Sequence, residues 1–193
     1  MVNQQLISFL TGSNLISEET AVQIVDQFCE MEIEKNNFLL KEGKVCDCYL
    51  FLESRFMRSF AHDTEGNEIT TGFYGVNEVV FEVSSFFNRT GSKENIQAVI
   101  DCMGKFITYD QLNMLFHTLP EFREFGRSIL VKGFAGMKNR MLSMITASAE
   151  ERYVGLINSR PDIFQYGHLK HVASYLGITD TSLSRIRREY MAG

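Results

Sequence analysis

The sequence predicts an α+β fold in which a strand-rich N-terminal region is followed by one long helix and then by a small helical region. Three observations predict this order. Short apolar runs separated by turn residues fill positions 1–120, a helical repeat of apolar residues occupies 121–149, and two shorter helical patterns joined by a glycine lie within 150–193. A chain of 193 residues with 45% hydrophobic residues can form one domain or two small ones.

Region 1–120 has the pattern of short strands. Ser17 is expected to cap a short helix, and the runs after it are interrupted by turns at Gly43 and Gly66. Polar and apolar residues roughly alternate from Arg55 to Phe60, as in a strand with one buried face. Regular short strands of this kind are typical of a sandwich or roll.

Region 121–149 is predicted to be a single long helix. Its apolar residues recur at intervals of three and four, at Phe122, Phe125, Ile129, Gly133, Met137, Met141 and Met144. This face either packs on its own domain or pairs with the same helix of a second subunit. Gly126, Gly133 and Gly136 each weaken a helix by about 1 kcal/mol relative to alanine. Because close approach of two backbones would explain that cost, we favour a homodimer through helix 121–149.

Segment 169–190 has the pattern of a helix-turn-helix. Gly177 can adopt the positive φ that ends the first helix, and Thr179 is a suitable N-cap for the second. The apolar residues expected to face inward are Leu169, Val172, Ala173, Leu176, Ile178, Leu183, Ile186 and Tyr190. The alternative is an ordinary helical hairpin whose arginines are solvated. The joint placement of Gly177 and the apolar residues favours the helix-turn-helix.

The second helix of this segment carries short hydroxyl side chains near its N-terminus and arginines along one face, which suits base edges and phosphates of DNA. The predicted DNA contacts are Lys170, His171, Thr179, Thr181, Ser182, Ser184, Arg185 and Arg188. Arg185 is expected on a guanine, and Lys170, His171 and Thr179 on phosphates. A wing, if the unit has one, is expected from the segment 164–167, since only three residues follow Tyr190.

The charge distribution agrees with a DNA-binding C-terminal end. Residues 151–193 hold six basic and four acidic side chains, a net +2, whereas the rest holds 13 basic and 20 acidic side chains, a net −7. An acidic body repels DNA while a mildly basic end can dock on it. Neither a signal peptide nor a membrane span is recognisable, so we expect a cytoplasmic protein without a membrane partner.

No metal or cofactor is expected. Cys46 and Cys48 have no second Cys or His pair nearby, which favours small core-filling thiols over a metal or redox site. His168 and His171 are three residues apart but lack an evident third ligand. The sequence also lacks a nucleophile–base elbow, a P-loop and a zinc signature, so we expect no enzymatic activity.

The chain resembles the Crp/Fnr superfamily of bacterial transcription regulators, and within it the branch common in Bacteroidetes-type bacteria. The resemblance rests on Gly43, Arg58, Phe73 and the segments 49–51, 66–70, 82–87, 95–98, 171–179 and 182–187. It implies a cyclic-nucleotide-binding-like β jelly roll as sensor domain (1–120), a dimerisation helix (121–149) and a C-terminal winged helix-turn-helix (150–193). It further implies a palindromic double-stranded operator and makes RNA polymerase a candidate partner. Arg55 stands where the family has a turn glycine, which predicts a strained hairpin.

The effector site is where the sequence departs from this family. Members that bind cyclic nucleotides hold the phosphate with a Gly-Glu pair and an arginine, which correspond here to Phe81-Glu82 and Ser92, with Lys93 next to it. Ser92 cannot form a bidentate charged contact, and Phe81 would occupy space beside the anion, so cyclic AMP or GMP is not expected. The candidate effector residues are Phe73, Phe81, Glu82, Ser92 and Lys93, in a pocket made apolar by Phe73, Val79, Phe81, Val83 and Cys102.

Two functions from different classes follow. The leading one is a dimeric, sequence-specific transcription regulator of the Crp/Fnr type with an atypical effector pocket. The alternative is a small-molecule sensor or binding module in which DNA binding is secondary.

Overall fold

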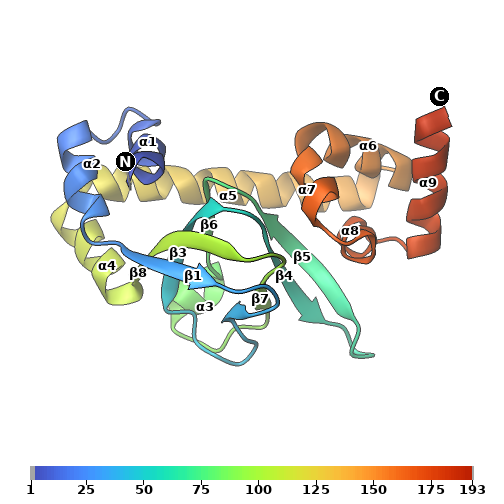
Figure 1. Ribbon diagram of the computed structural model, residues 1–193, viewed down its shortest axis with the longest axis horizontal. Coiled ribbons are helices and arrows are strands. Elements are labelled where there is room, and N and C mark those ends of the chain that lie inside the picture. Colours follow the sequence, from blue (N-terminus) through green and yellow to red (C-terminus); the bar gives the residue numbers. More distant parts are fainter. Residues whose placement is uncertain (1–2, 193) are drawn as a thin grey trace.

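The computed structural model describes residues 3–192 and consists of a β-roll and a helical unit connected by one long helix (Figure 1). The roll lies along this helix, α5 (Pro120–Thr146), with small helices around its start and a group of four helices at its end. None of the described helices is long and apolar enough to cross a membrane.

The roll is built from two four-stranded antiparallel sheets. Their strand orders are β1-β8-β3-β6 and β2-β7-β4-β5, so that neighbours in a sheet are mostly distant in sequence. The strands are β1 (Cys29–Ile33), β2 (Phe38–Leu40), β3 (Cys48–Ser54), β4 (Met57–His62), β5 (Glu68–Tyr74), β6 (Glu78–Val80), β7 (Asn95–Ala98) and β8 (Cys102–Thr108). This topology confirms the predicted α+β class and the antiparallel roll within it.

Turn chemistry sets the hairpins of the roll where the sequence indicated. Gly43 and Gly66 have φ of +80° and +84°, values that glycine adopts without steric cost. Arg55, between β3 and β4, also has a positive φ of 74°, which confirms that this hairpin is strained in the absence of glycine.

Four short helices accompany the strands. They are α1 (Gln4–Thr11), α2 (Glu18–Val25), α3 (Val83–Asn88) and α4 (Tyr109–Thr118). Ser17 caps α2 as predicted, its Oγ accepting from the Thr20 backbone N–H at 3.2 Å. Thr108 and Gln111 form a capping box at the start of α4.

Helix α5 begins at Pro120, whose fixed φ suits a first helical position, and is followed by Ser148, which caps the next helix. Phe122 and Phe125 are each only 2% exposed and belong to the core of the roll. Beyond them Ile129 packs partly on the same core, and the remaining large apolar residues of α5 are solvent-exposed in the single chain. These are Leu130, Val131, Phe134, Met137, Met141, Leu142, Met144 and Ile145.

The helix glycines do not share one explanation. A Cβ on Gly126 would lie 2.5 Å from a ring carbon of Phe116 in α4. The glycine is therefore needed to make room for the Phe116 ring of the same chain. The interpretation of Gly126 as a point of approach between two subunits is therefore wrong. Gly133 and Gly136 have open space around them, and an intermolecular role for them stays a prediction.

The C-terminal unit contains helices only. They are α6 (Ala149–Ser159), α7 (Pro161–Tyr166), α8 (Leu169–Leu176) and α9 (Asp180–Ala192). The predicted wing at 164–167 is wrong. Helix α7 begins at Pro161 and continues to Tyr166, so this segment is helical and not a hairpin of strands. Among residues 3–192, no strand follows Thr108.

Candidate functional site

The turn between α8 and α9 has the geometry expected of a helix-turn-helix. Gly177 has a φ of +68°, its N–H donates to the Ser174 carbonyl, and the Ile178 N–H donates to the Ala173 carbonyl, both at 3.0 Å. These bonds close the C-terminus of α8 in a left-handed cap. Thr179 then caps α9, with its Oγ1 accepting from the Ser182 N–H at 3.2 Å.

A small apolar core fixes the two helices against each other. The fully buried residues of this core on α6–α9 are Tyr153, Ile163, Val172, Ala173, Leu176, Leu183 and Ile186. Leu169, predicted to face inward, is 40% exposed because it begins α8 at the edge of the unit. Tyr190 is 44% exposed yet retains an edge contact with Tyr153, with ring centres 5.5 Å apart.

The outward face of α9 carries most of the predicted DNA contacts. Thr181, Ser184, Arg185 and Arg188 are exposed there, while Ser182 is half-buried and bonded to Thr179. Arg185 and Arg188 have no acidic partner within the described part of the chain. Lys170 is exposed in the first turn of α8, and Thr179 at the start of α9. The helix thus presents free guanidinium groups beside small hydroxyl groups, the donor set suited to base edges and phosphates.

His171 does not lie on this face. Its side chain points to the roll and is 8% exposed, with Nε2 3.9 Å from Glu68 Oε2 of β5. Burial, together with the positive charges of Arg58 and Lys170, lowers the pKa of His171 to about 4. A neutral imidazole beneath the roll cannot reach a DNA phosphate in this conformation, so the predicted phosphate contact is corrected.

The C-terminal unit docks on the roll through β5. Arg140 of α5 joins the two, since its Nη1 donates to the Thr71 carbonyl and its Nη2 to the Tyr175 carbonyl, each at 3.1 Å. The same guanidinium lies 4.0 Å from the centre of the Tyr175 ring. Ser174 accepts from the Thr70 N–H at 2.8 Å. These partners lie 35 to 104 residues apart, and no local pattern in the sequence indicated them.

An ion pair and an aromatic contact complete the docking. Arg160, which precedes α7, donates to both carboxylate oxygens of Glu78 at 3.1 Å and also pairs with Asp162. Phe73 lies between Phe56 and Tyr175, with ring centres at 5.6 and 5.2 Å. Phe73 is therefore chiefly a docking residue, although it also borders the cavity described next.

A mostly apolar cavity of about 890 Å³ lies between the roll and α5. Phe81 and Glu82 border it from the roll, and Ile129, Gly133 and Met137 border it from the helix. Of the remaining predicted lining residues, Val79 and Val83 are present and Cys102 is not. Ser92 and Lys93 also lie outside it, so their assignment to this pocket is wrong.

The residues that correspond to the family's phosphate-binding positions have structural partners of their own. Phe81 packs on Tyr49 and Phe86, with ring centres 5.0 and 5.3 Å away. Glu82 caps α3 by accepting from the N–H groups of Ser84 and Ser85. Ser92 is 3% exposed, and its Oγ accepts from the Glu94 N–H at 3.0 Å within a turn.

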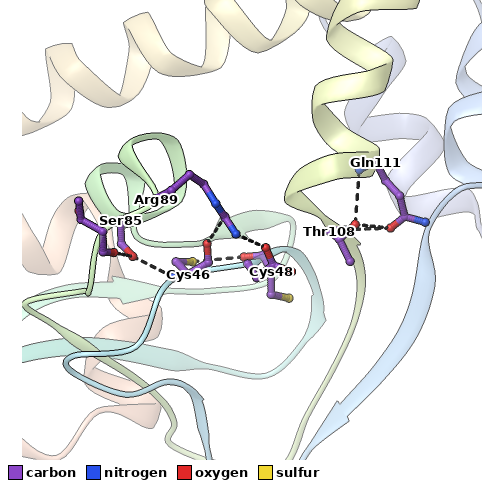
Figure 2. Close-up of polar contacts among 8 residues, drawn as sticks. Cys46, Cys48, Ser85, Arg89, Thr108 and Gln111 are labelled. Atoms are coloured by element: carbon purple, nitrogen blue, oxygen red, sulfur yellow. Dashed lines mark hydrogen bonds and ion pairs between the residues drawn. The ribbon is translucent and has the colours of Figure 1, made fainter.

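Arg89 is the arginine nearest in sequence to this site, and it turns away from it. Figure 2 shows the guanidinium beside Cys46, where Nη1 donates to the carbonyl at 3.0 Å while Nη2 pairs with Asp47. Ser85, also labelled there, accepts from the Cys46 N–H at 2.8 Å. Arg89 therefore fastens the loop before β3 to the end of α3, and it does not border the cavity.

The cysteines of this loop are not poised for reaction. Burial raises the pKa of the Cys48 thiol to about 12, with the neighbouring Cys46 and Asp47 adding to the effect, so it is protonated at neutral pH. Within residues 3–192, no three His, Cys, Asp or Glu side chains are grouped so as to hold a metal ion.

The architecture has counterparts among solved structures. FixK2 from Bradyrhizobium japonicum superposes with a TM-score of 0.75 over 86% of this chain and 85% of its own, at 14% identity. The regulator CLP of Xanthomonas campestris, described as c-di-GMP responsive, gives 0.71 over 91% and 92%, at 15% identity. A structure from Eubacterium rectale described within the Crp/Fnr family gives 0.70 over 96% and 88%, at 14% identity.

Comparison with protein-family models and with curated proteins yields no match. The structural likeness spans most of each chain, and it shows that this chain has the fold of Crp/Fnr-type regulators.

Proposed function

We propose that the protein is a sequence-specific DNA-binding transcription regulator of the Crp/Fnr type. The observation that carries this proposal is helix α9, which exposes Thr181, Ser184, Arg185 and Arg188 on one face while Leu183 and Ile186 anchor the other. The helix lies at the end of the molecule opposite α1 and α2 (Figure 1). Its basic face therefore stands apart from the acidic roll, and a duplex can approach it.

We propose that the regulator is a homodimer through α5. In the single chain Phe134 and Met137 are 70% and 71% exposed, and they continue as an apolar surface to Ile145. A contiguous apolar surface of this kind is typical of a subunit interface. A two-fold dimer would place two copies of α9 on half-sites about 34 Å apart in a palindromic operator. RNA polymerase is the further partner that this function implies.

We propose that cyclic AMP and GMP are not the effectors. Phe81 is packed among aromatic rings, Glu82 caps a helix, and Ser92 is held in a turn, so none of the three presents a donor to a cyclic phosphate. The 890 Å³ cavity favours instead an apolar effector, held between the roll and α5.

The same cavity supports the second candidate function, a small-molecule sensor in which DNA binding is secondary. Neither function requires a catalytic step, and none is proposed.

Selection of bound sequences from random duplex DNA tests the proposal and gives an operator. With that operator, Arg185→Ala should cost about 1–3 kcal/mol of binding free energy and relax preference at one base pair. Lys93→Ala, which removes an equal charge from the roll, should leave operator affinity nearly unchanged. Ligand-dependent stabilisation without any selected DNA sequence would favour the sensor, and equal effects of the two substitutions would contradict the role of Arg185.

A further inference from the structure

A second hollow, of about 520 Å³, lies between the outside of the roll and the N-terminus of α8. Arg58 of β4 and Gln97 of β7 are register partners, and their neighbours Met57 and Ile96 belong to the core of the roll. Since side chains alternate along a strand, Arg58 and Gln97 face outward, toward the C-terminal unit. The hollow is separate from the apolar cavity against α5 and is lined by polar groups.

Two side chains in this hollow are buried with unmatched hydrogen-bonding atoms. Arg58 is 4% exposed; its Nε and Nη2 donate to Gln97 and its Nη2 to Glu68, but its Nη1 has no partner among the described residues. His171 is 8% exposed, and neither ring nitrogen has a hydrogen-bond partner there. Buried polar groups in folded proteins are nearly always paired, so Arg58 Nη1 and the single N–H of the neutral His171 ring are donors that a ligand would engage.

The electrostatics of the hollow favour an anion. Arg58 and Lys170 contribute two positive charges against the single carboxylate of Glu68. The pKa of Glu68 is lowered because the hydrogen bond and charge of Arg58, with His171 and Lys170, outweigh its partial burial. Helix α8 points its N-terminus at the same space, and His168 at its N-cap position provides no side-chain hydrogen bond. A helix N-terminus adds partial positive charge and free N–H groups, which suit a phosphate.

We propose that this hollow binds the phosphate group of a small molecule. Arg58, Lys170, His168 and His171 would donate to its oxygens, and the ligand would bridge β4 of the roll and α8 of the DNA-binding unit. Three acceptor oxygens on one group match donors that converge from different elements. The same chemistry exists in the DNA backbone, but Arg58 lies too deep for a duplex, which favours a free phosphate compound.

Occupation of the site would regulate docking, because its two walls belong to different parts of the molecule. A ligand that binds only when α8 lies on the roll stabilises that arrangement by its differential affinity. The site would thus act independently of any effector in the apolar cavity.

Inorganic phosphate is the probe, titrated into the full chain at constant ionic strength with chloride as reference. Calorimetry and the thermal midpoint should show saturable binding to the wild type. Arg58→Gln should weaken it at least tenfold, and Lys170→Gln several-fold, while Lys93→Gln should leave it unchanged. Because phosphate also stabilises proteins nonspecifically, the difference between wild type and Arg58→Gln is the deciding quantity.

Equal phosphate responses of wild type and Arg58→Gln would overturn the proposal. Should Arg58→Gln fail to fold, Lys170→Gln and His168→Gln, which change exposed residues, replace it. Phosphate responses of these variants equal to that of the wild type would then overturn the proposal. Arg185→Ala separates the two sources of phosphate. It should retain phosphate binding, and loss of binding in this variant would assign the anion to α9 and overturn the proposal. These outcomes do not depend on operator binding, so they are distinguishable from failure of the proposed function.

Discussion

The two halves of α5 carry similar residues in opposite environments. In the first half Phe122 and Phe125 are buried in the core of the roll, whereas in the second half Phe134 and Met137 are largely exposed. Both halves satisfy the same helical spacing of apolar residues. The difference shows that periodicity identifies the face of a helix that becomes buried but not the chain that buries it.

The largest expected effect lies in the buried half. Phe122→Ala should lower the free energy of unfolding by about 3–5 kcal/mol, because it opens a cavity in the core. The matched change Phe134→Ala should alter it by no more than about 0.5 kcal/mol in dilute, monomeric protein. Urea unfolding at low concentration measures both. Comparable losses of unfolding free energy in the two variants would mean that the second half of α5 is buried by residues of the same chain, and the two halves would then not differ.

A charge in the exposed half should act on assembly. Phe134→Glu should weaken dimerisation by about 2 kcal/mol or more, since it places a carboxylate in an apolar interface. Asn139→Glu introduces the same group on the opposite side of α5 and is the control. Sedimentation equilibrium should detect monomers only for the first variant, and an unchanged dimer would remove α5 as the interface.

The glycines distinguish the halves by a smaller effect. Gly126→Ala should cost about 1–3 kcal/mol, because its Cβ would overlap the Phe116 ring. Gly133→Ala, in open space, should stabilise the monomer by up to about 1 kcal/mol. Thermal unfolding measures the effect of Gly126→Ala in the monomer and in the dimer alike. If Gly133→Ala also weakens the dimer, the backbones of two subunits approach closely at Gly133. If it leaves the dimer unchanged, the interpretation of Gly133 as a point of close approach fails.

The last effect is absent at neutral pH, appears only on acidification, and concerns the unit at the end of α5. The pKa of His171 is about 4 when docked, below its ordinary 6.5, so the undocked or unfolded chain binds more protons between these values. Docked stability is therefore fully present above pH 6.5 and falls, by up to about 1.4 kcal/mol per unit, as the pH drops toward 4. His171→Gln should flatten this part of the profile of stability against pH. A variant profile parallel to the wild type would show that other groups cause the dependence.

The parts of the fold that the sequence predicted correctly are those that depend on residues close together in the chain. Ser17, Gly177 and Thr179 specify caps through their own backbone and side-chain preferences, and Arg55 indicated strain because glycine is absent there. The inward positions Leu183 and Ile186 followed from helical spacing alone. The expected wing at 164–167 was wrong because Pro161 begins a further helix there, a position that its fixed φ favours.

The docking of the C-terminal unit could not be predicted in this way. Arg160 meets Glu78 across 82 residues, and His171 is buried by a strand about 100 residues earlier. Each of these polar residues is compatible with a solvated surface position, so only the tertiary arrangement distinguishes a buried pair from an exposed charge. For the same reason, the hollow around Arg58 had no counterpart among the sequence predictions.

Arg140 gives the molecule a mechanical property that its domains lack separately. One guanidinium on α5 holds a carbonyl of β5 and a carbonyl of α8 at the same time. A rotation of α5 about its own axis must then displace both carbonyls or break one of the bonds. A rotation of α5 would therefore be transmitted to the roll and to the C-terminal unit through this one side chain.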